Sequence, residues 1–463
     1  MPHIQKCFHH ICRDGSFGNI ETGASLRSDV RTLADILCYS RESATAGALY
    51  QWILALEEGS LGKDHPDTLT TVYSMANVFL SQGKYDEALE WFRRALVGEE
   101  MSLGKDHPDT LSTVNSMANV FLRQGKYDEA LEWYRRALVG REMSLGKDHP
   151  DTLSTVNSMA NVFLSQGKYG EALEWYRRAL VGEEMSLGKD HPDTLSTVYS
   201  MANVFLRQGK YDEALEWFRR ALVGQEISLG KDHPDTLSTV YSMANMFLRQ
   251  GKFDEALEWY RRALVGEEMS LGKDHPDTLS TVYSMANVFL SQGKYDEALE
   301  WYRRALVGVE MSLGKDHPNT LATVHSMANV FRSQGRYDEA LEWFRRALVG
   351  EEMSLGKDHP DTLSTVHGIA SVFWSQGKYC EAVERYRRAL AGWEKSLGNN
   401  HPHTLTAVNN IAQVFRMQGK DDEALVLFRR ALAGREKSLG KDHPSTLATS
   451  RSITELLQKQ MSE

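Results

Sequence analysis

Apolar side chains recur at intervals of three and four residues in two neighbouring stretches of the chain. The first stretch begins at Pro66 and carries apolar residues at Leu69, Val72, Met75, Ala76 and Phe79. The second begins at Tyr85 and carries Ala88, Leu89, Phe92, Ala95 and Leu96. This spacing gathers the apolar residues on one face of a helix. The pattern therefore predicts two amphipathic helices that pack on each other.

Local signals mark where these two helices begin and end. Pro66 suits a first helical turn because it has no N–H to leave unpaired, and the charge of Asp67 is favourable there. Gly83 is predicted to end the first helix, since glycine readily takes the left-handed cap conformation. Gly98 and its copies, Gly140 to Gly434, fall in or at the end of the second helix. Close packing, a bend or a helix stop would each explain them.

The two-helix pattern repeats every 42 residues, and nine full units run from Leu61 to Ser438. Its clearest marker is an Asp-His-Pro turn, in one copy Asn-His-Pro. The histidines of this turn are His65, His107, His149, His191, His233, His275, His317, His359, His401 and His443. A single enzyme does not need so many copies of a general base. We therefore interpret the histidine as a turn or cap residue that precedes each first helix.

The run from Val114 to Leu138, VNSMANVFLRQGKYDEALEWYRRAL, resembles a tetratricopeptide repeat. The motif residues of that family fall on Val114, Met117, Ala118, Phe121, Gly125, Ala130, Tyr134 and Ala137. The family's usual repeat of about 34 residues ends in a proline, whereas this one carries REMSLGKDHPDTL instead. The longer form is similar to the repeats of kinesin light chains. The resemblance implies an all-α fold, a right-handed α-solenoid of tandem helix–turn–helix repeats.

The regions outside the nine full repeats are expected to extend the array. We predict that residues 1–26 form a disordered leader, 27–60 a degenerate N-terminal repeat, and 439–463 a C-terminal capping helix. The degenerate repeat keeps the apolar phase at Val30, Leu33, Ala34, Leu37, Leu49 and Tyr50. Leu447, Ile453 and Leu457 continue a first helix at the other end. A terminal helix with a more polar face is what a solenoid needs for solubility.

Positions that vary between repeats are the candidates for partner binding, because repeats 103–144 and 145–186 differ at only three places: Arg123/Ser165, Asp128/Gly170 and Arg141/Glu183. One varying column of the first helices holds Tyr73, Asn115, Asn157, Tyr199, Tyr241, Tyr283, His325, His367 and Asn409. A second holds Arg123, Arg207 and Arg249 among mostly serine copies. Both lie off the apolar stripe, and the family resemblance implies that first helices line a concave groove. We expect these residues to contact an extended peptide and to tolerate substitution without loss of the fold; neutral drift at exposed positions is the alternative.

Composition narrows the kinds of partner. A formal charge of −10 and a pI of about 5.9 argue against nucleic acid. The arginine pairs Arg93-Arg94 through Arg429-Arg430 are interpreted as a solvated helix face paired with Glu90 and its copies. No apolar run approaches the roughly 18 residues of a membrane span. Of four cysteines only Cys380 lies within the full repeats, which favours a reducing, cytoplasmic setting.

Catalytic and cofactor signals are weak. Cys7, His9, His10 and Cys12 form the only metal-like cluster, and no second ligand pair follows it at finger-like spacing. The run GNIETGAS, residues 18–25, has the glycine spacing of a phosphate loop, but Ala24 replaces the required lysine. The sequence therefore predicts no metal, no cofactor and no catalytic residue.

A non-enzymatic scaffold that binds a protein or peptide in a groove is the predicted function. The first alternative is a kinesin-light-chain-like cargo adaptor, although residues 1–60 show no sustained heptad pattern for pairing with a motor chain. The second is the sensor half of a split or truncated receptor ATPase. The sequence does not identify the partner or the oligomeric state.

Overall fold

A computed structural model describes residues 24–39 and 43–462, with side chains for 30–37 and 44–460. Within these ranges every regular element is an α-helix, as predicted. Two compact units divide the chain, Met1–Ser228 and Leu229–Glu463, and each is considered by itself. The cluster Cys7–Cys12, residues 18–23 of the glycine-rich run and most of the predicted leader lie outside the described residues.

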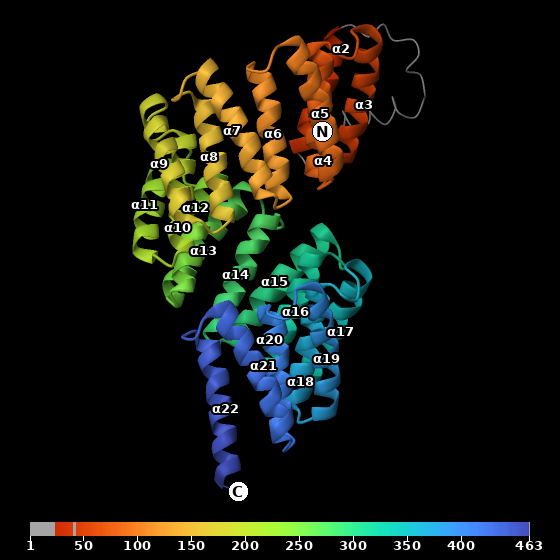
Figure 1. The fold of residues 1–463 in the computed structure, drawn as a ribbon, viewed down its shortest axis with the longest axis vertical. Coiled ribbons are helices and arrows are strands. Elements are labelled where there is room, and N and C mark those ends of the chain that lie inside the picture. Colours follow the sequence, from red (N-terminus) through yellow and green to blue (C-terminus); the bar gives the residue numbers. More distant parts are fainter. Residues whose placement is uncertain (1–23, 40–42, 463) are drawn as a thin grey trace. The chain divides into compact units, whose positions relative to one another are not determined.

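The helices come in antiparallel pairs, each with a shorter first helix and a longer second helix (Figure 1). The first helices are α4 (Pro66–Ser81), α6 (Pro108–Arg123), α8 (Pro150–Ser165), α10 (Pro192–Arg207), α12 (Pro234–Arg249), α14 (Pro276–Ser291), α16 (Pro318–Ser333), α18 (Pro360–Ser375) and α20 (Pro402–Met417). The second helices are α5 (Tyr85–Ser102), α7 (Tyr127–Ser144), α9 (Tyr169–Ser186), α11 (Tyr211–Ser228), α13 (Phe253–Ser270), α15 (Tyr295–Leu313), α17 (Tyr337–Ser354), α19 (Tyr379–Ser396) and α21 (Asp421–Leu439). Within each unit successive pairs stack side by side, which makes the fold an α-solenoid.

The Asp-His-Pro turn caps the first helix, which confirms the structural interpretation of its histidine. In α4 the Nδ1 atom of His65 accepts a hydrogen bond of 3.2 Å from the backbone N–H of Asp67. This bond satisfies one of the orphan N–H groups at the helix start. Pro66 occupies the first turn, as expected. The same cap recurs before the other first helices, so the repeated histidine fixes where each helix begins.

The predicted apolar stripes form the core between the paired helices. In α4 the buried residues of the stripe are Leu69, Val72, Met75 and Ala76. In α5 they are Ala88, Leu89, Phe92, Ala95 and Leu96. Burying a leucine or phenylalanine side chain contributes about 1.5–3 kcal/mol, and the stripes recur in every pair. Each core joins successive pairs, since residues from three successive repeats pack in one cluster around Tyr134.

The second helices continue one turn beyond the glycine that recurs in each repeat. Gly98 lies inside α5, which ends at Ser102, so the glycine neither stops the helix nor follows it. A β-carbon on Gly98 would lie 2.5 Å from Cδ2 of Leu69 in the partner helix. Close packing is therefore the reason for this glycine. The extra turn buries the side chain that follows it, Glu99.

Two further helices precede the first full repeat, and one follows the last. Helices α2 (Ala24–Tyr39) and α3 (Ser43–Ser60) pack on each other, and Ala34, Leu49 and Tyr50 are buried between them and α4. Helix α22 (Pro444–Ser462) packs on α21 through Leu456 and Ile453. Leu447 and Leu457, which the sequence pattern placed on the apolar face, are 43% and 37% exposed.

Candidate partner-binding surface

The nine residues of the first-helix column, Tyr73 to Asn409 as listed above, are half-buried. Tyr241 shows how such a side chain is held. Its ring meets the buried ring of Tyr260 edge-on at 5.5 Å, and its hydroxyl lies 2.9 Å from Oγ of Ser284 on the next first helix. Tyr283 makes the corresponding contacts with Tyr302 and Ser326. The column therefore joins the core to the surface at each repeat junction.

The ring contacts of the aromatic members argue against the expectation that this column tolerates substitution freely. The period of the first helix correctly places Tyr241 beside the apolar stripe, but the core ring of Tyr260 packs against it. Removing the Tyr241 ring would expose part of that core ring. A variant of this column must keep the ring if it is to report on binding alone.

The two histidines of the column are neutral near pH 7. Burial lowers the pKa of His325 to about 4, and the pKa of His367 likewise to about 4. The Nδ1 atom of His325 lies 2.8 Å from Oγ1 of Thr365, and Nε2 of His367 lies 2.9 Å from Nδ2 of Asn410. These imidazoles therefore add polar contacts to the surface and no positive charge.

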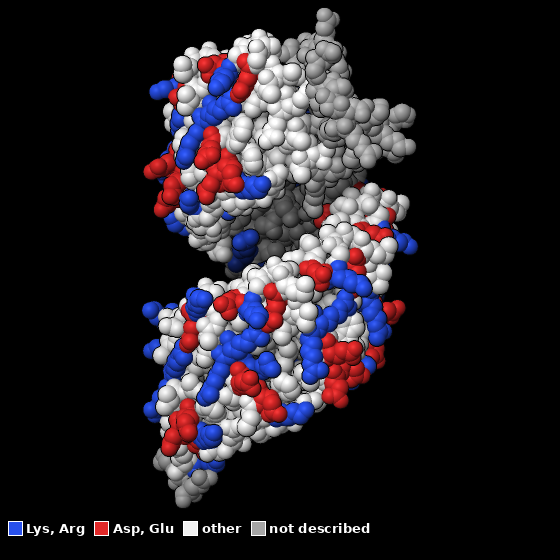
Figure 2. All heavy atoms as spheres, turned by 90° about the vertical axis from the view of Figure 1, so that its right-hand side faces the viewer, with Lys and Arg blue, Asp and Glu red and all other residues white. Residues whose placement is uncertain are grey.

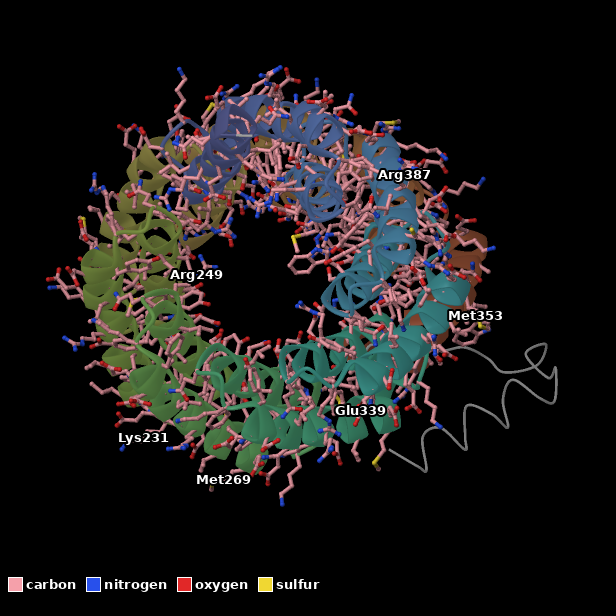
Figure 3. All side chains as sticks on the ribbon, turned by 90° about the horizontal axis from the view of Figure 1, so that it is seen from below. Lys231, Arg249, Met269, Glu339, Met353 and Arg387 are labelled. Carbon is pink, nitrogen blue, oxygen red and sulfur yellow. The ribbon has the colours of Figure 1, made fainter. Side chains whose placement is uncertain are left out.

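The arginines of the second varying column, Arg123, Arg207 and Arg249, are exposed. None of their guanidinium groups makes a hydrogen bond or ion pair in the part of the chain described. In the second unit Arg249 projects to the inner side of the curved array, whereas Met269 and Met353 project outward (Figure 3). Arg249 thus places an exposed cation on the inner side of the second unit.

Sequence reasoning missed a third column, in the last turn of the second helices. We call it the floor column; it holds Glu57, Glu99, Arg141, Glu183, Gln225, Glu267, Val309, Glu351, Trp393 and Arg435. All ten side chains are buried. The signal was present in the sequence, because Arg141 and Glu183 are one of the few differences between two nearly identical repeats.

Two charged members of the floor column, Glu57 and Arg141, hydrogen-bond to residues of neighbouring helices. Arg31 donates to Glu57 at 2.7 Å, and the Thr71 hydroxyl donates to the other carboxylate oxygen at 2.7 Å. Arg141 donates to the backbone oxygen of Asp151 and to Thr155, both at 2.8 Å. These side chains act as polar links between successive repeats.

Four other members, Glu99, Glu183, Glu267 and Glu351, each keep a buried Oε2 atom with no hydrogen-bond partner. Burial raises the pKa of all four carboxyls, and in Glu99, Glu267 and Glu351 it raises the pKa to about 7. A threonine hydroxyl beside each carboxyl offsets part of this shift and a nearby aspartate adds to it; for Glu267 these are Thr281 and Asp277. A buried carboxylate that lacks partners carries a large desolvation penalty, which a cation can offset.

Three pockets open between successive first helices of the second unit, with the floor column at their base. The first, of about 210 Å³, lies between α12 and α14 and is lined by Tyr241, Glu267 and Asp277, among others. The second, of about 250 Å³, has Val309 at its base. The third, of about 170 Å³, contains His325, Glu351 and Asp361. Residues predicted to contact a partner therefore line real pockets.

The arginine pairs lie on a paired helix face, but their partner is not the predicted one. Arg178 of α9 forms an ion pair with Glu142 of the preceding second helix and lies over the ring of Trp175 at 5.6 Å. Equivalent pairs join Arg94 to Glu58, Arg136 to Glu100, Arg220 to Glu184, Arg304 to Glu268, Arg346 to Glu310, Arg388 to Glu352 and Arg430 to Glu394. Figure 2 shows lysine and arginine interspersed with aspartate and glutamate on one face.

The outer side of the second helices carries exposed apolar residues. Val265 is 59% and Met269 is 74% exposed, and similar pairs recur along the array. None of the described helices is both long and apolar enough to cross a membrane. Among the described residues, no three histidine, cysteine or acidic side chains are grouped so that they could hold a metal ion.

Comparison with known proteins supports the repeat assignment. The tetratricopeptide repeat model matches successive stretches from residue 25 to residue 437, including 25–97, 109–181, 193–265, 277–350 and 361–437. The chain belongs to the tetratricopeptide repeat family. Its helix pairs are the units of that family, lengthened to 42 residues by the extra turn and the capped turn. No curated relative matches the sequence.

Several solved structures of repeat proteins are similar to this chain at low sequence identity. The nearly identical repeats of a kinesin-light-chain-like protein from Podospora anserina are 24% identical and cover 45% of this chain and 98% of theirs, with a TM-score of 0.41. A tetratricopeptide repeat protein from Parabacteroides merdae is 19% identical over 67% of this chain and 98% of its own, with a TM-score of 0.43. A signal transduction ATPase with a tetratricopeptide repeat sensor, from Pyrococcus horikoshii, is 13% identical over 82% of this chain and 54% of its own, with a TM-score of 0.51.

Proposed function

We propose that this protein is a non-enzymatic scaffold that binds an extended segment of a partner protein along the inner surface of its first helices. The observation that carries the proposal is the lining of the three pockets. Tyr241, Tyr283 and His325, which vary along an otherwise repetitive array, form walls of these pockets. Ligand sites are concave and combine apolar walls with a few placed polar groups. Tetratricopeptide repeats generally act as interaction modules, which agrees with this role.

The exposed arginines offer a second set of contacts on the same helices. Arg123, Arg207 and Arg249 can donate to backbone carbonyls or carboxylates of a bound segment, because their guanidinium groups are unpaired in the described structure. The cysteine content favours action in a reducing, cytoplasmic setting. A cargo adaptor or the sensor half of a receptor ATPase would use the same surface.

A display library of disordered peptides, selected against the full chain, tests the proposal. Enriched peptides should lose affinity for the variant Arg123→Ala/Arg207→Ala/Arg249→Ala. The matched control is Arg135→Ala/Arg219→Ala/Arg261→Ala, which removes the same charge from exposed positions of second helices. Normal binding by the first variant together with loss of binding by the control would contradict the proposal, as would a selection that enriches nothing.

A further inference from the structure

The pockets of the second unit differ in charge in a regular order. The first has Glu267 at its base and Asp277 at its rim, and the third has Glu351 and Asp361 in the same places. In the pocket between them, Val309 replaces the glutamate and Asn319 replaces the aspartate. The order along the array is therefore acidic, apolar, acidic.

The residue at the base of the pocket position and the residue at its rim also change together at other repeat junctions of the second unit. At the next junction Trp393 occupies the base, and the ring of His403, in the place of the rim aspartate, stacks on it at 5.3 Å. At the last junction Arg435 at the base is matched by Ser445 at the rim. In the first unit Glu57, Glu99 and Glu183 are each followed by a rim aspartate. The exceptions are Arg141, which donates to the backbone of Asp151, and Gln225, which is followed by Asp235. The charge of each pocket is thus set by two residues at once.

The acidic pockets have the features that a long cationic side chain requires. In the first, Pro234, Leu237 and Leu271 supply an apolar wall, which suits the methylene stem of lysine or arginine. Glu267 is 5% exposed, and its Oε2 atom is buried without a hydrogen-bond partner. Glu351, 3% exposed, has the same unsatisfied oxygen. An ammonium or guanidinium group would supply the missing donor.

We propose that the two acidic pockets and the apolar pocket between them bind a basic–apolar–basic segment of an extended partner chain, with a lysine or arginine entering each acidic pocket. This inference rests on the proposed function, and it specifies the chemistry of the partner at α12 to α18. His325 does not oppose a cation, because burial lowers its pKa to about 4.

Geometry sets the spacing of the three anchors. Packed helices lie about 8–10 Å apart, and an extended chain advances about 3.3–3.6 Å per residue. One repeat junction therefore corresponds to roughly three residues of the partner. The expected pattern is a basic residue, two spacers, an apolar residue, two spacers and a second basic residue. Because this pattern is symmetric, it fits in either chain direction.

Calorimetric titration of the full chain at pH 8 tests the inference. The probe is the capped peptide Gly-Lys-Ser-Ser-Leu-Ser-Ser-Lys-Gly, compared with peptides in which both lysines become glutamine or glutamate. The lysine peptide should bind about tenfold or more tightly than the glutamine peptide, the size of one charged hydrogen bond. The variant Glu267→Gln/Glu351→Gln should remove this preference. Gln225 stands at the same place in another repeat, so the fold accommodates glutamine there.

The control variant Glu258→Gln/Glu342→Gln makes the same change of net charge at exposed sites of α13 and α17. It should alter binding by less than about twofold, because exposed charges are screened by salt. Equal binding of the three peptides, no binding of the lysine peptide, or undiminished binding to the pocket variant would overturn the inference. In each of these cases a display-selected segment that depends on Arg249 leaves the scaffold proposal standing.

Discussion

The side chain of Leu153 in α8 packs directly against Gly182 in α9. A β-carbon on Gly182 would lie 2.7 Å from Cδ2 and 2.9 Å from Cδ1 of Leu153, and this leucine is only 1% exposed. The two backbones therefore approach as closely as they do because the glycine has no side chain. Gly170, in the first turn of the same helix, has no atom within 4 Å of its would-be β-carbon. Helix α9 thus contains one glycine that contacts a neighbouring helix, Gly182, and one with open space around it, Gly170.

We expect Gly182→Ala to destabilise the protein although alanine is the better helix former. Alanine gains about 1 kcal/mol of propensity over glycine, but overpacking a buried contact typically costs about 1–3 kcal/mol. Gly170→Ala meets no clash and should be neutral or stabilising. Urea denaturation monitored by circular dichroism compares the two midpoints. A higher midpoint for Gly182→Ala would show that the close contact is not what selects glycine.

The buried glutamates predict how stability depends on pH. Burial raises the folded-state pKa of Glu99, Glu267 and Glu351 from 4.5 to about 7. The folded state therefore holds protons that the unfolded state has lost between these values, so stability falls as pH rises from about 4.5 through about 7. Below that window the penalty is absent, and above it the penalty is complete.

The variant Glu99→Gln/Glu267→Gln/Glu351→Gln isolates this contribution. Relative to wild type, it should gain stability at pH 8 and gain little at pH 5, where the wild-type carboxyls are protonated in the folded state. Thermal midpoints of both proteins at the two pH values provide the comparison. Parallel pH profiles would mean that these carboxyls titrate normally.

The second-helix ion pairs should contribute modestly and in a salt-dependent way. Arg178 and Glu142 are 36% and 24% exposed, and pairs of this kind typically contribute about 0.2–1 kcal/mol. A double-mutant cycle with Arg178→Ala and Glu142→Gln should yield a coupling in that range that shrinks at 1 M salt. Arg177→Ala, an exposed neighbour, is the control. Coupling that persists unchanged at high salt would assign the interaction to packing on Trp175 instead.

Two substitutions of Tyr241 measure separately what packing and hydrogen bonding contribute to stability in the first-helix column. Tyr241→Phe removes only the hydroxyl contact with Ser284, a loss of about 0.5–1.5 kcal/mol. Tyr241→Ala also removes the edge contact with Tyr260 and should cost several-fold more, approaching the roughly 3–5 kcal/mol of a core aromatic. Unfolding midpoints distinguish the two. Equal midpoints would place the ring outside the core contacts.

Much of the fold could be predicted from the sequence because its signals are local. Pro66, Gly83 and the three-and-four spacing from Leu69 to Phe79 mark one helix within a single repeat. The floor column could not be found this way. A glutamate in a helix's last turn normally faces solvent, and Glu267 is buried only because α14 packs over the end of α13. The partner of Arg178 was missed for the same reason, since Glu142 belongs to the preceding repeat.

Hydrogen exchange of the full chain, with and without a display-selected peptide, tests most directly whether the first helices form the binding surface. The account predicts that slowed exchange is concentrated in the first two turns of α12, α14, α16 and α18, which line the pockets around Glu267, Val309 and Glu351. Protection confined to the outer side of the second helices, around Val265 and Met269, would contradict it.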